Sequence, residues 1–533
     1  MVVFPKHHEQ ANSIMVNHEP GKLTPELAAT QVEVEAYARG YGLDFFPTLF
    51  ELIDADQLNA VAARGGFPSR YPHWRFGMEY EQLSKGYQYG LQKIYELVIN
   101  NDPCYAYLMR TNAAVDQKLV MAHVYGHSDF FKNNLWFAHT HRKMMDEMAN
   151  HGTRIRRIID EMGVEVVEDF VDTCLSIEDL IDIHQPFIQR RSSAERDDFT
   201  HSPKKKPPPE PARFQAKPYM QPFINPPETI RTEADRLAGE HAQQSFPEHP
   251  ERDVMQFLLV HAPLEGWQAE VLTILRDEAY YFAPQAQTKI MNEGWASYWH
   301  STIMIHQGLA AADVVNYCDH HSGTLASSPG QLNPYKVGIE LFRHIEDRWN
   351  RGAFGTEYDR CDDFKKRRDW DAGADMGREK IFEVRRIHND LTFIDEFLTL
   401  DFVREHKLFR FGYNPGSEAY EIESREFPIV KQQLLQSLTN RGLPTIEVLD
   451  GNYKNRGELF LEHAYTGVEL QLDYASDTLE HLHSLWKRPV HLATVLKGDR
   501  AVLSYDGAQH QTETSPSGPG KHGPEGQDGG AAA

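Results

Sequence analysis

Two histidines four residues apart, His123 and His127, are the clearest chemical signal in the sequence. On a helix, residues at this spacing lie one above the other on the same face. Leu119, Ala122 and Phe130 share that stripe, so both imidazoles are expected to point into the protein. Two inward-facing histidines on one helix are a common way to bind zinc. The alternative is a pair of core histidines whose nitrogens are satisfied by hydrogen bonds.

A carboxylate in the segment KIMNEGWASYWH, residues 289–300, is the best candidate for a third ligand. On a helix, Glu293 and His300 share one face with Ser297, whereas the aromatic residues of the segment cover another. A helix wrapped in aromatic residues is buried, and a buried carboxylate needs a cation or a hydrogen-bond donor. We therefore predict a metal held by Glu293 and the two histidines, with His300 as a fourth ligand or a proton donor.

The residue that would act as general base is less clear from the sequence. The usual zinc-peptidase form of such a helix is HExxH, but Val124 stands where that motif has its glutamate. Glu278 shares a helical stripe with Ile274 and Tyr281, so it is expected to be buried and could replace that base. A buried ion pair with an arginine is the alternative interpretation. His300 is the other candidate for a catalytic role.

Other reaction chemistries find little support. A di-iron carboxylate bundle requires two ExxH pairs on facing helices, and we find this spacing at Glu480 and His483, far from the other candidates. A single-metal site is therefore expected, with zinc or another divalent metal. The Walker loop GxxxxGK[ST] and the nucleophile elbow GxSxG are absent, which disfavours nucleotide hydrolysis and serine-hydrolase chemistry. Four further histidines show no pattern and are expected to face solvent: His139, His141, His320 and His321.

The candidate residues require helices to position them, and helical periodicity extends over most of the chain. Residues 31–64 and 71–185 are expected to be mainly helical, and helical patterning resumes near 232 and continues to about 405. After residue 407, segments such as PTIEVLD, GELFLEHAY and HLATVLKG alternate apolar and polar residues, with helical stretches near 428–440 and 475–487. We therefore predict an α+β fold, with a large helical N-terminal body and a smaller, β-rich α+β C-terminal domain.

The sequence divides into six expected segments. They are a flexible N-terminus (1–30), the first part of the helical domain with the HVYGH motif (31–189), a Pro/Lys-rich linker or surface excursion (190–216), the second part of the helical domain with the NEGWASYWH motif (217–405), the C-terminal domain (406–506) and a disordered tail (507–533).

Composition limits the classes of function. The 533 residues contain 55 Lys and Arg against 78 Asp and Glu, a net charge of −23 that disfavours nucleic-acid binding. No apolar run approaches the roughly 20 residues of a membrane helix, and the N-terminus has no signal-peptide pattern. The four cysteines are scattered without a CxxC pair, as in a protein with reduced thiols. A cytoplasmic protein that does not insert into membranes is predicted.

Several long motifs resemble the SpoVR family (stage V sporulation protein R). They are FPTLFELIDADQLNAVAARGGFPSRYPHWRFGMEYE, VINNDPCYAYLM, HVYGHSDFFKNN and QTKIMNEGWASYWH, and the resemblance covers about residues 30 to 505 apart from the linker. It implies a cytoplasmic bacterial protein connected with the spore cortex or with stress responses. It also implies association with a PrkA-like serine protein kinase and a von Willebrand-type protein. The family resemblance does not define a reaction.

A shorter string is similar to zinc hydrolases. Residues 293–296, Glu-Gly-Trp-Ala, resemble the EGWA segment of a family in which that glutamate joins two histidines of an HExxH-like helix. This resemblance implies a metallohydrolase-like helical domain with His123, His127 and Glu293 as ligands. Val124 is the departure from that pattern, and it leaves peptidase activity in question.

Three hypotheses follow for the function. The first is a zinc-dependent hydrolase of amide bonds, with a peptidoglycan-related substrate and with Glu278 or His300 as base. The second is a regulatory or scaffold protein that works with the PrkA-like kinase and carries a structural metal or none. The third is a buried polar network without a metal. An open coordination position separates the first two, because structural zinc is enclosed by four protein ligands.

Overall fold

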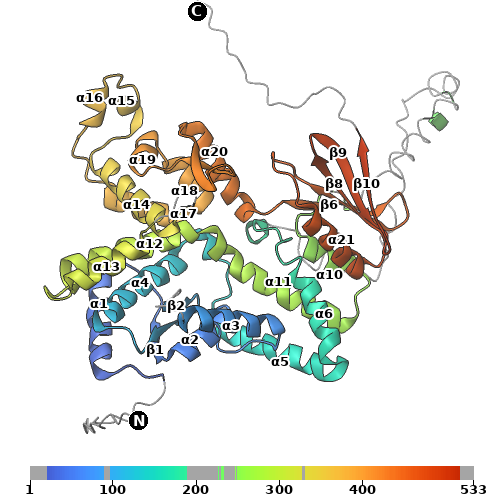
Figure 1. The fold of residues 1–533 in the computed structure, drawn as a ribbon, viewed down its shortest axis with the longest axis horizontal. Helices are drawn as coiled ribbons and strands as arrows, with labels where there is room; N and C mark the ends of the chain where they lie inside the picture. The colour runs from blue at the N-terminus through green and yellow to red at the C-terminus, as the bar shows by residue number, and fades with distance from the viewer. Residues whose placement is uncertain are drawn as a thin grey trace, which may run out of the picture. The chain divides into compact units, whose positions relative to one another are not determined.

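The computed structural model describes residues 21–88, 96–188, 226, 230–232, 246–247, 249–326 and 331–515 (Figure 1). Within these residues the chain is mostly helical and carries a five-stranded mixed sheet near its C-terminus, so the predicted α+β class is confirmed. The chain forms two compact units. The first unit combines Met1–Arg157 with Pro284–Arg441, and the second combines Ile158–Ala283 with Gly442–Ala533.

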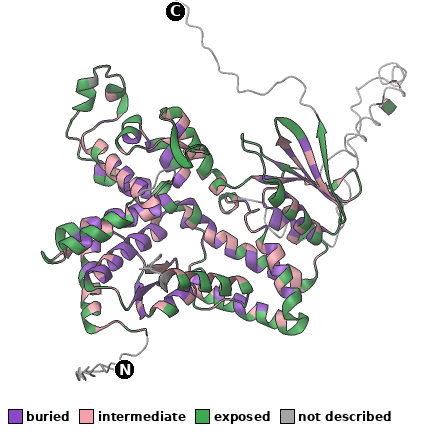
Figure 2. Cartoon of the chain, viewed as in Figure 1, coloured by how far each residue is buried: buried purple, intermediate pink, exposed green. Residues whose placement is uncertain are grey.

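The first unit is built around three helices that pack side by side, α4 (Ala114–Asn133), α12 (Lys289–Ile303) and α14 (Pro334–Asn350). Figure 2 shows α4 and α12 buried along most of their length. Its other helices are α1 (Pro25–Gly40), α2 (Ala55–Ala63), α3 (Trp74–Gln88), α13 (Val314–Thr324), α15 (Gly355–Asp359), α16 (Phe364–Arg368), α17 (Gly377–Ile387), α18 (Asp390–Phe397), α19 (Leu400–Glu405) and α20 (Phe427–Leu438). Short 3-10 and π turns follow α4 and α12, at Leu135–Phe137 and Met304–Gly308.

Polar caps fix the ends of several of these helices. Asp54 starts α2 with a capping box, in which its side chain accepts a hydrogen bond from the backbone N–H of Gln57 and the Gln57 side chain accepts one from the backbone N–H of Asp54. Asn333 caps α14 directly before Pro334, a residue that suits the first helical turn because its missing N–H would have no partner there. The sequence therefore encodes these starts locally.

Residues 31–64 and 71–185 are mainly helical, as predicted, but they also contain a three-stranded sheet that the sequence pattern does not predict. Its order is β1 (Thr48–Ile53), β3 (Cys104–Met109), β2 (Glu96–Ile99). β1 and β3 are parallel, with Thr48 opposite Cys104 and Ile53 opposite Met109. β3 is almost entirely buried, and the exposed position of β1 is the apolar Leu49. Neither strand therefore shows the alternation of apolar and polar residues that identifies a half-exposed strand in a sequence.

The second unit contains the five-stranded sheet, in the order β10-β9-β8-β7-β6. Its strands are β6 (Ile446–Tyr453), β7 (Glu458–His463), β8 (Val490–Leu496), β9 (Asp499–Tyr505) and β10 (His510–Ser515). β7 and β8 are parallel, joined through α21 (Leu472–Trp486), and the other neighbours are antiparallel. The helices α6 (Val164–Leu175) and α10 (Val254–His261) complete this unit. Gln185–Phe187 forms a 3-10 turn within it. Two longer helices, α5 (Met144–Met162) and α11 (Gly266–Gln287), contribute residues to both units.

The grouping into units does not follow the linear order of the six expected segments. The hairpin β4 (Arg410–Asn414) and β5 (Ala419–Ser424), predicted within the C-terminal domain, groups with the first unit, as does α20. Residues 249–283, predicted within the second part of the helical domain, group with the second unit.

Strand β10 corrects part of the predicted disordered tail. All six of its residues are exposed, so the segment buries little and gives no hydrophobic pattern. It is ordered by pairing with β9, from His510 opposite Tyr505 to Ser515 opposite Arg500. Residues 516–533, residues 1–20 of the predicted N-terminus and the linker 190–216 lie outside the described residues. No described helix is both long enough and apolar enough to span a bilayer.

Candidate metal centre

The predicted ligands lie on α4 and α12, the two most deeply buried helices of the first unit. Asp129, fully buried on α4, accepts a hydrogen bond of 2.8 Å from the indole Nε1 of Trp295 on α12. The guanidinium of Arg385 lies 3.4 Å from the same carboxylate and compensates its charge. Burial raises the pKa of Asp129 to about 6, although Arg385 opposes this shift. This polar group fixes how the two helices align.

Small residues let the helix backbones approach closely at the site. A Cβ atom on Gly126 would lie only 2.7 Å from the Cα of Ala296, and one on Gly294 would lie 2.4 Å from the backbone of Gly338 on α14. Real Cβ contacts are not this short. α12 is therefore held between α4 and α14 at backbone contact distance, which places the ligand side chains within reach of one another.

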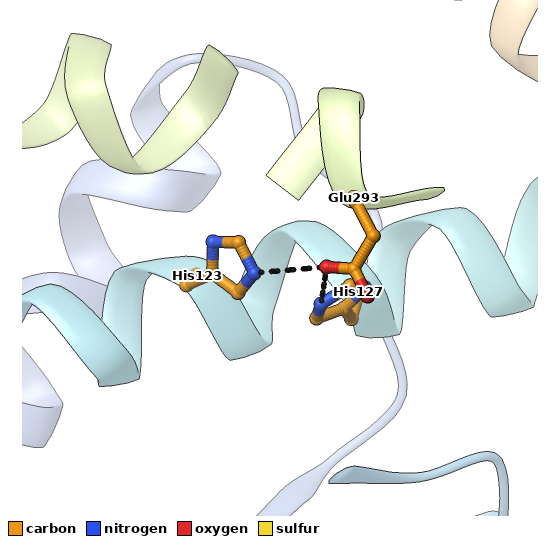
Figure 3. Close-up of side chains that lie close together, drawn as sticks. All are labelled: His123, His127 and Glu293. Carbon is orange, nitrogen blue, oxygen red and sulfur yellow. Dashed lines mark ion pairs between the residues drawn. The ribbon is translucent and has the colours of Figure 1, made fainter. Parts of the chain in front are cut away.

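His123, His127 and Glu293 meet in the space between α4 and α12, as the sequence predicts (Figure 3). The Nε2 atoms of His123 and His127 lie 3.6 and 3.5 Å from the same oxygen, Oε2 of Glu293. Their candidate ligand atoms all lie within 4.8 Å of one another. Both histidines are buried, at 3% and 4% exposure.

The spacing of these atoms fits a bound metal. Two ligand atoms that bind one tetrahedral zinc at about 2.1 Å are about 3.4 Å apart, close to both measured distances. Hydrogen bonds between nitrogen and oxygen are usually nearer 2.9 Å. Among the described residues, the buried Oε2 atom of Glu293 has no hydrogen-bond partner. A divalent cation between the three side chains would satisfy it, and the donor set of two imidazoles and one carboxylate is one that zinc accepts.

Two neighbours contact the outer nitrogens of the histidines. His127 Nδ1 lies 2.8 Å from Oδ1 of Asn292, and His123 Nδ1 lies 2.8 Å from Nδ1 of His300. If Nε2 of each histidine is reserved for the metal, Nδ1 carries the proton and donates it to these partners. Such outer partners orient metal-binding imidazoles and fix their tautomers.

His300 continues this chain of imidazoles. If its Nδ1 accepts from His123, its proton is on Nε2, which lies 3.2 Å from Nδ1 of His321 on α13. His321 is half-buried and its ring stacks on Tyr317 at 5.5 Å. The expectation that His321 faces solvent is therefore wrong. No sequence spacing connects it to the site, because it enters through the packing of α13 on α4.

Electrostatics keep Glu293 ionised. Burial by itself would raise its pKa, but the two imidazoles that face its carboxylate, those of His123 and His127, hold the pKa of Glu293 well below its ordinary value. Burial also holds the pKa of His300 well below that of a free imidazole, and the neighbouring histidines add to this effect. An ionised carboxylate is the form in which Glu293 could bind a cation.

Two further positions of the prediction, Val124 and Glu278, are not members of this group. Val124 is fully buried in the hydrophobic core, so no carboxylate follows His123. Glu278 is buried, at 3% exposure, on the part of α11 that belongs to the second unit. Its catalytic role stays a prediction. Asn292 and Tyr335, whose ring stacks on His123 with 6.3 Å between centroids, were not identified from the sequence.

The sequence is similar to proteins of one family along most of its length. A family model described as SpoVR like protein matches residues 22–443, and a model described as SpoVR-like C-terminal domain matches residues 444–497. The uncharacterized protein YcgB of Escherichia coli (strain K12) is 29% identical over 483 residues, which cover 85% of this chain and 89% of that protein. No solved structure matches the chain. The three candidate ligands all lie within residues 22–443.

Proposed function

The chain belongs to the SpoVR-like family, and we propose that it is a metal-dependent hydrolase in which His123, His127 and Glu293 hold zinc or another divalent metal. The observation that carries this proposal is the buried Glu293 oxygen, which faces two imidazole nitrogens at 3.5 and 3.6 Å and has no hydrogen-bond donor among the described residues. No fourth His, Cys, Asp or Glu joins these three in the described part of the chain. An incomplete protein ligand set is typical of catalytic zinc.

The chemistry supplied by a metal in this site is polarisation of a carbonyl and activation of water. The chain's own residues have separate tasks. Asn292 and His300 keep both ligand imidazoles in the tautomer that leaves Nε2 available. His300 and His321 provide a hydrogen-bonded route along which a proton can move from the buried site towards the half-buried edge of α13.

Amide bonds are the substrate class that we propose. The buried His-His-Glu group supports hydrolysis, and the resemblance to proteins connected with the spore cortex favours a peptidoglycan-related amide. His300 is the proposed proton carrier because it contacts a ligand imidazole directly. Glu278 is kept as the proposed base that would replace the glutamate missing at Val124.

Elemental analysis of the purified protein tests the site. The wild type is expected to contain about one zinc, manganese or iron ion per chain. A His123→Ala/His127→Ala variant is expected to lose it. The matched control is His139→Ala/His141→Ala, which removes two exposed histidines from the loop after α4 and is expected to keep the metal.

Two results would contradict the metal centre. One is metal-free wild-type protein that neither binds added zinc nor melts at a higher temperature with it. The other is equal metal content in both double variants. If the metal is present, hydrolysis of peptidoglycan-derived amides by the wild type, by His300→Ala and by Glu278→Gln tests the reaction itself.

A regulatory protein with a structural metal is the second candidate function. The observation that favours it is Val124, whose side chain is fully buried in the core where hydrolases of this helix type carry their base. In this proposal the chain works with a PrkA-like serine protein kinase and a von Willebrand-type protein. A stoichiometric metal without any hydrolysis, together with co-purification of the kinase, would favour this candidate over the hydrolase.

A further inference from the structure

We propose that the first unit binds a small organic anion with an aromatic body, in a cavity separate from the metal centre. The cavity has a volume of about 560 Å³ and is lined by the start of α14, by α19 and the loop after it, by β4 and by α20. Cavities of roughly 300–1,000 Å³ are typical of sites for small molecules. None of the metal-centre residues lines it.

The charge of the cavity differs from that of the chain. Its wall includes Lys336, Lys407 and His406, and neither Asp nor Glu lines it, although the chain as a whole carries a net charge of −23. Neither lysine forms an ion pair with a carboxylate among the described residues. α14 begins at this wall, and the N-terminal end of a helix carries partial positive charge. A ligand with a negative group is therefore favoured here.

Lys407 forms the turn between α19 and the next part of the cavity wall. Lys407 follows α19 with φ of 53°, in the left-handed region where glycine or asparagine is usually found after a helix. Lysine is less suited to this conformation. After this turn, Leu408, Phe409 and Phe411 line the cavity.

The apolar part of the wall indicates the body of the ligand. Phe402, Phe409 and Phe411 line the cavity, together with Val430 and Leu434 from α20. Aromatic rings pack favourably against other rings by offset or edge-to-face contacts. Three phenylalanines beside two lysines therefore match a ring system that bears a carboxylate or a similar anionic group.

Titration calorimetry with three naphthalenes of the same size tests the proposal on the full-length protein. The probes are 2-naphthoate, which is an anion, 2-naphthalenemethanol, which is neutral, and 2-naphthylmethylammonium, which is a cation. We expect the anion to bind most tightly and the cation most weakly. Lys336→Gln/Lys407→Gln should weaken binding of the anion about tenfold and leave the neutral probe nearly unchanged.

Two further variants locate the site. Leu434→Trp fills the cavity from the half-buried face of α20 and should abolish binding of all three probes, with an unchanged circular dichroism spectrum as the check on folding. Lys365→Gln/Lys366→Gln removes two lysines from α16, outside the cavity, and should bind like the wild type. Equal affinity for the three probes, no binding up to millimolar concentration, or equal loss in both lysine variants would overturn the proposal.

Discussion

The carboxylate of Asp390 anchors the helix that carries Glu293. It accepts hydrogen bonds from the backbone amides of Ile290 and Met291, at 2.8 and 2.9 Å. These amides belong to the first turn of α12, where backbone N–H groups have no partner within the helix. The formal cap, Thr288, makes no such bond with its side chain. A residue from α18 therefore caps α12 from a distance and fixes the position of Glu293 one turn further on.

The ionisation of Asp390 predicts a pH dependence of stability. Burial raises its pKa from 3.8 to about 7, although the two amide hydrogen bonds oppose this shift. The folded protein therefore binds this proton more tightly than the unfolded chain does. The contribution is complete below about pH 4 and is lost as the pH rises towards about 7. The Asp390→Asn variant keeps one acceptor oxygen but does not ionise. Its unfolding free energy should therefore lack the part of the decrease with rising pH that Asp390 causes.

Urea unfolding of the wild type and of Asp390→Asn at about pH 5 and about pH 8 measures this effect. The wild type should lose more unfolding free energy between the two values than the variant does. Asp395→Asn, an exposed neighbour on the same helix, should behave like the wild type. Equal declines in wild type and Asp390→Asn would contradict the assigned pKa.

Some residues of the metal centre can be predicted from the sequence and others cannot. His123 and His127 follow from helical spacing alone, and Glu293 follows from the need of a buried carboxylate for a cation. Asn292 could not be identified in this way, because adjacent residues on a helix point about 100° apart. It reaches His127 because α12 crosses α4 at that point. His321 could not be identified either, because it lies on a third helix, α13, and reaches His300 only through tertiary packing.

Among the helices, the contact between α4 and α12 at Gly126 decides whether the ligands meet. Gly126→Ala would place a methyl group 2.7 Å from the Cα of Ala296, a backbone atom that cannot yield by rotating. The helices must then separate. We expect a loss of about 1–3 kcal/mol of unfolding free energy and weaker zinc binding, since the distance from Glu293 to both imidazoles would increase.

Gly77→Ala on α3 is the matched control for this packing effect. Nothing lies within 4 Å of a Cβ atom at Gly77, so the same substitution should stabilise the protein by about 0.5–1 kcal/mol through helix propensity. Chemical unfolding and zinc titration of both variants provide the measurements. If Gly126→Ala behaved like Gly77→Ala, the close helix contact would not position the ligands.

Whole helices and strands can be predicted from the sequence when their apolar and polar residues follow a regular period. Strands β6, β7 and β8 and helices α20 and α21 fall within a few residues of their expected positions, because their sequences follow the strand or helix period and turn residues separate them. β1 and β3 are mostly buried and lie in a helical sequence context, so their apolar runs resemble helix. β10 could not be predicted for the opposite reason. It is exposed throughout, so it has no hydrophobic pattern, and it is ordered only by pairing with β9.

At the scale of the whole molecule, the second unit is assembled from two distant stretches of chain. The family model for the C-terminal domain matches residues 444–497. The five-stranded sheet, however, groups in one unit with residues 249–283. Glu251 and Val448 exchange two backbone hydrogen bonds, of 3.0 and 2.8 Å. These contacts join the residues before α10 to β6, so the matched C-terminal stretch is only part of a folding unit.

Phe257 on α10 is the main apolar contact of this assembly. It is 3% exposed, its ring stacks on Trp486 with 5.7 Å between centroids, and it lies against Gly451 of β6. Phe257→Ala should lower the unfolding free energy of the second unit by about 3–5 kcal/mol, because a cavity replaces the ring. The metal content should stay the same, since every residue of the metal centre belongs to the first unit.

Hydrogen exchange measured by mass spectrometry can follow the two units separately. In Phe257→Ala, peptides from β6 to β9 should lose protection, whereas peptides from α4 and α12 should keep it. Phe187→Ala, a control at an exposed position of the second unit, should change stability by less than about 1 kcal/mol. Equal loss of protection in α4 and α12, with loss of the metal, would show that the metal centre depends on the second unit. That result would mean that the C-terminal sheet is required for metal binding, because the ligands themselves are unchanged.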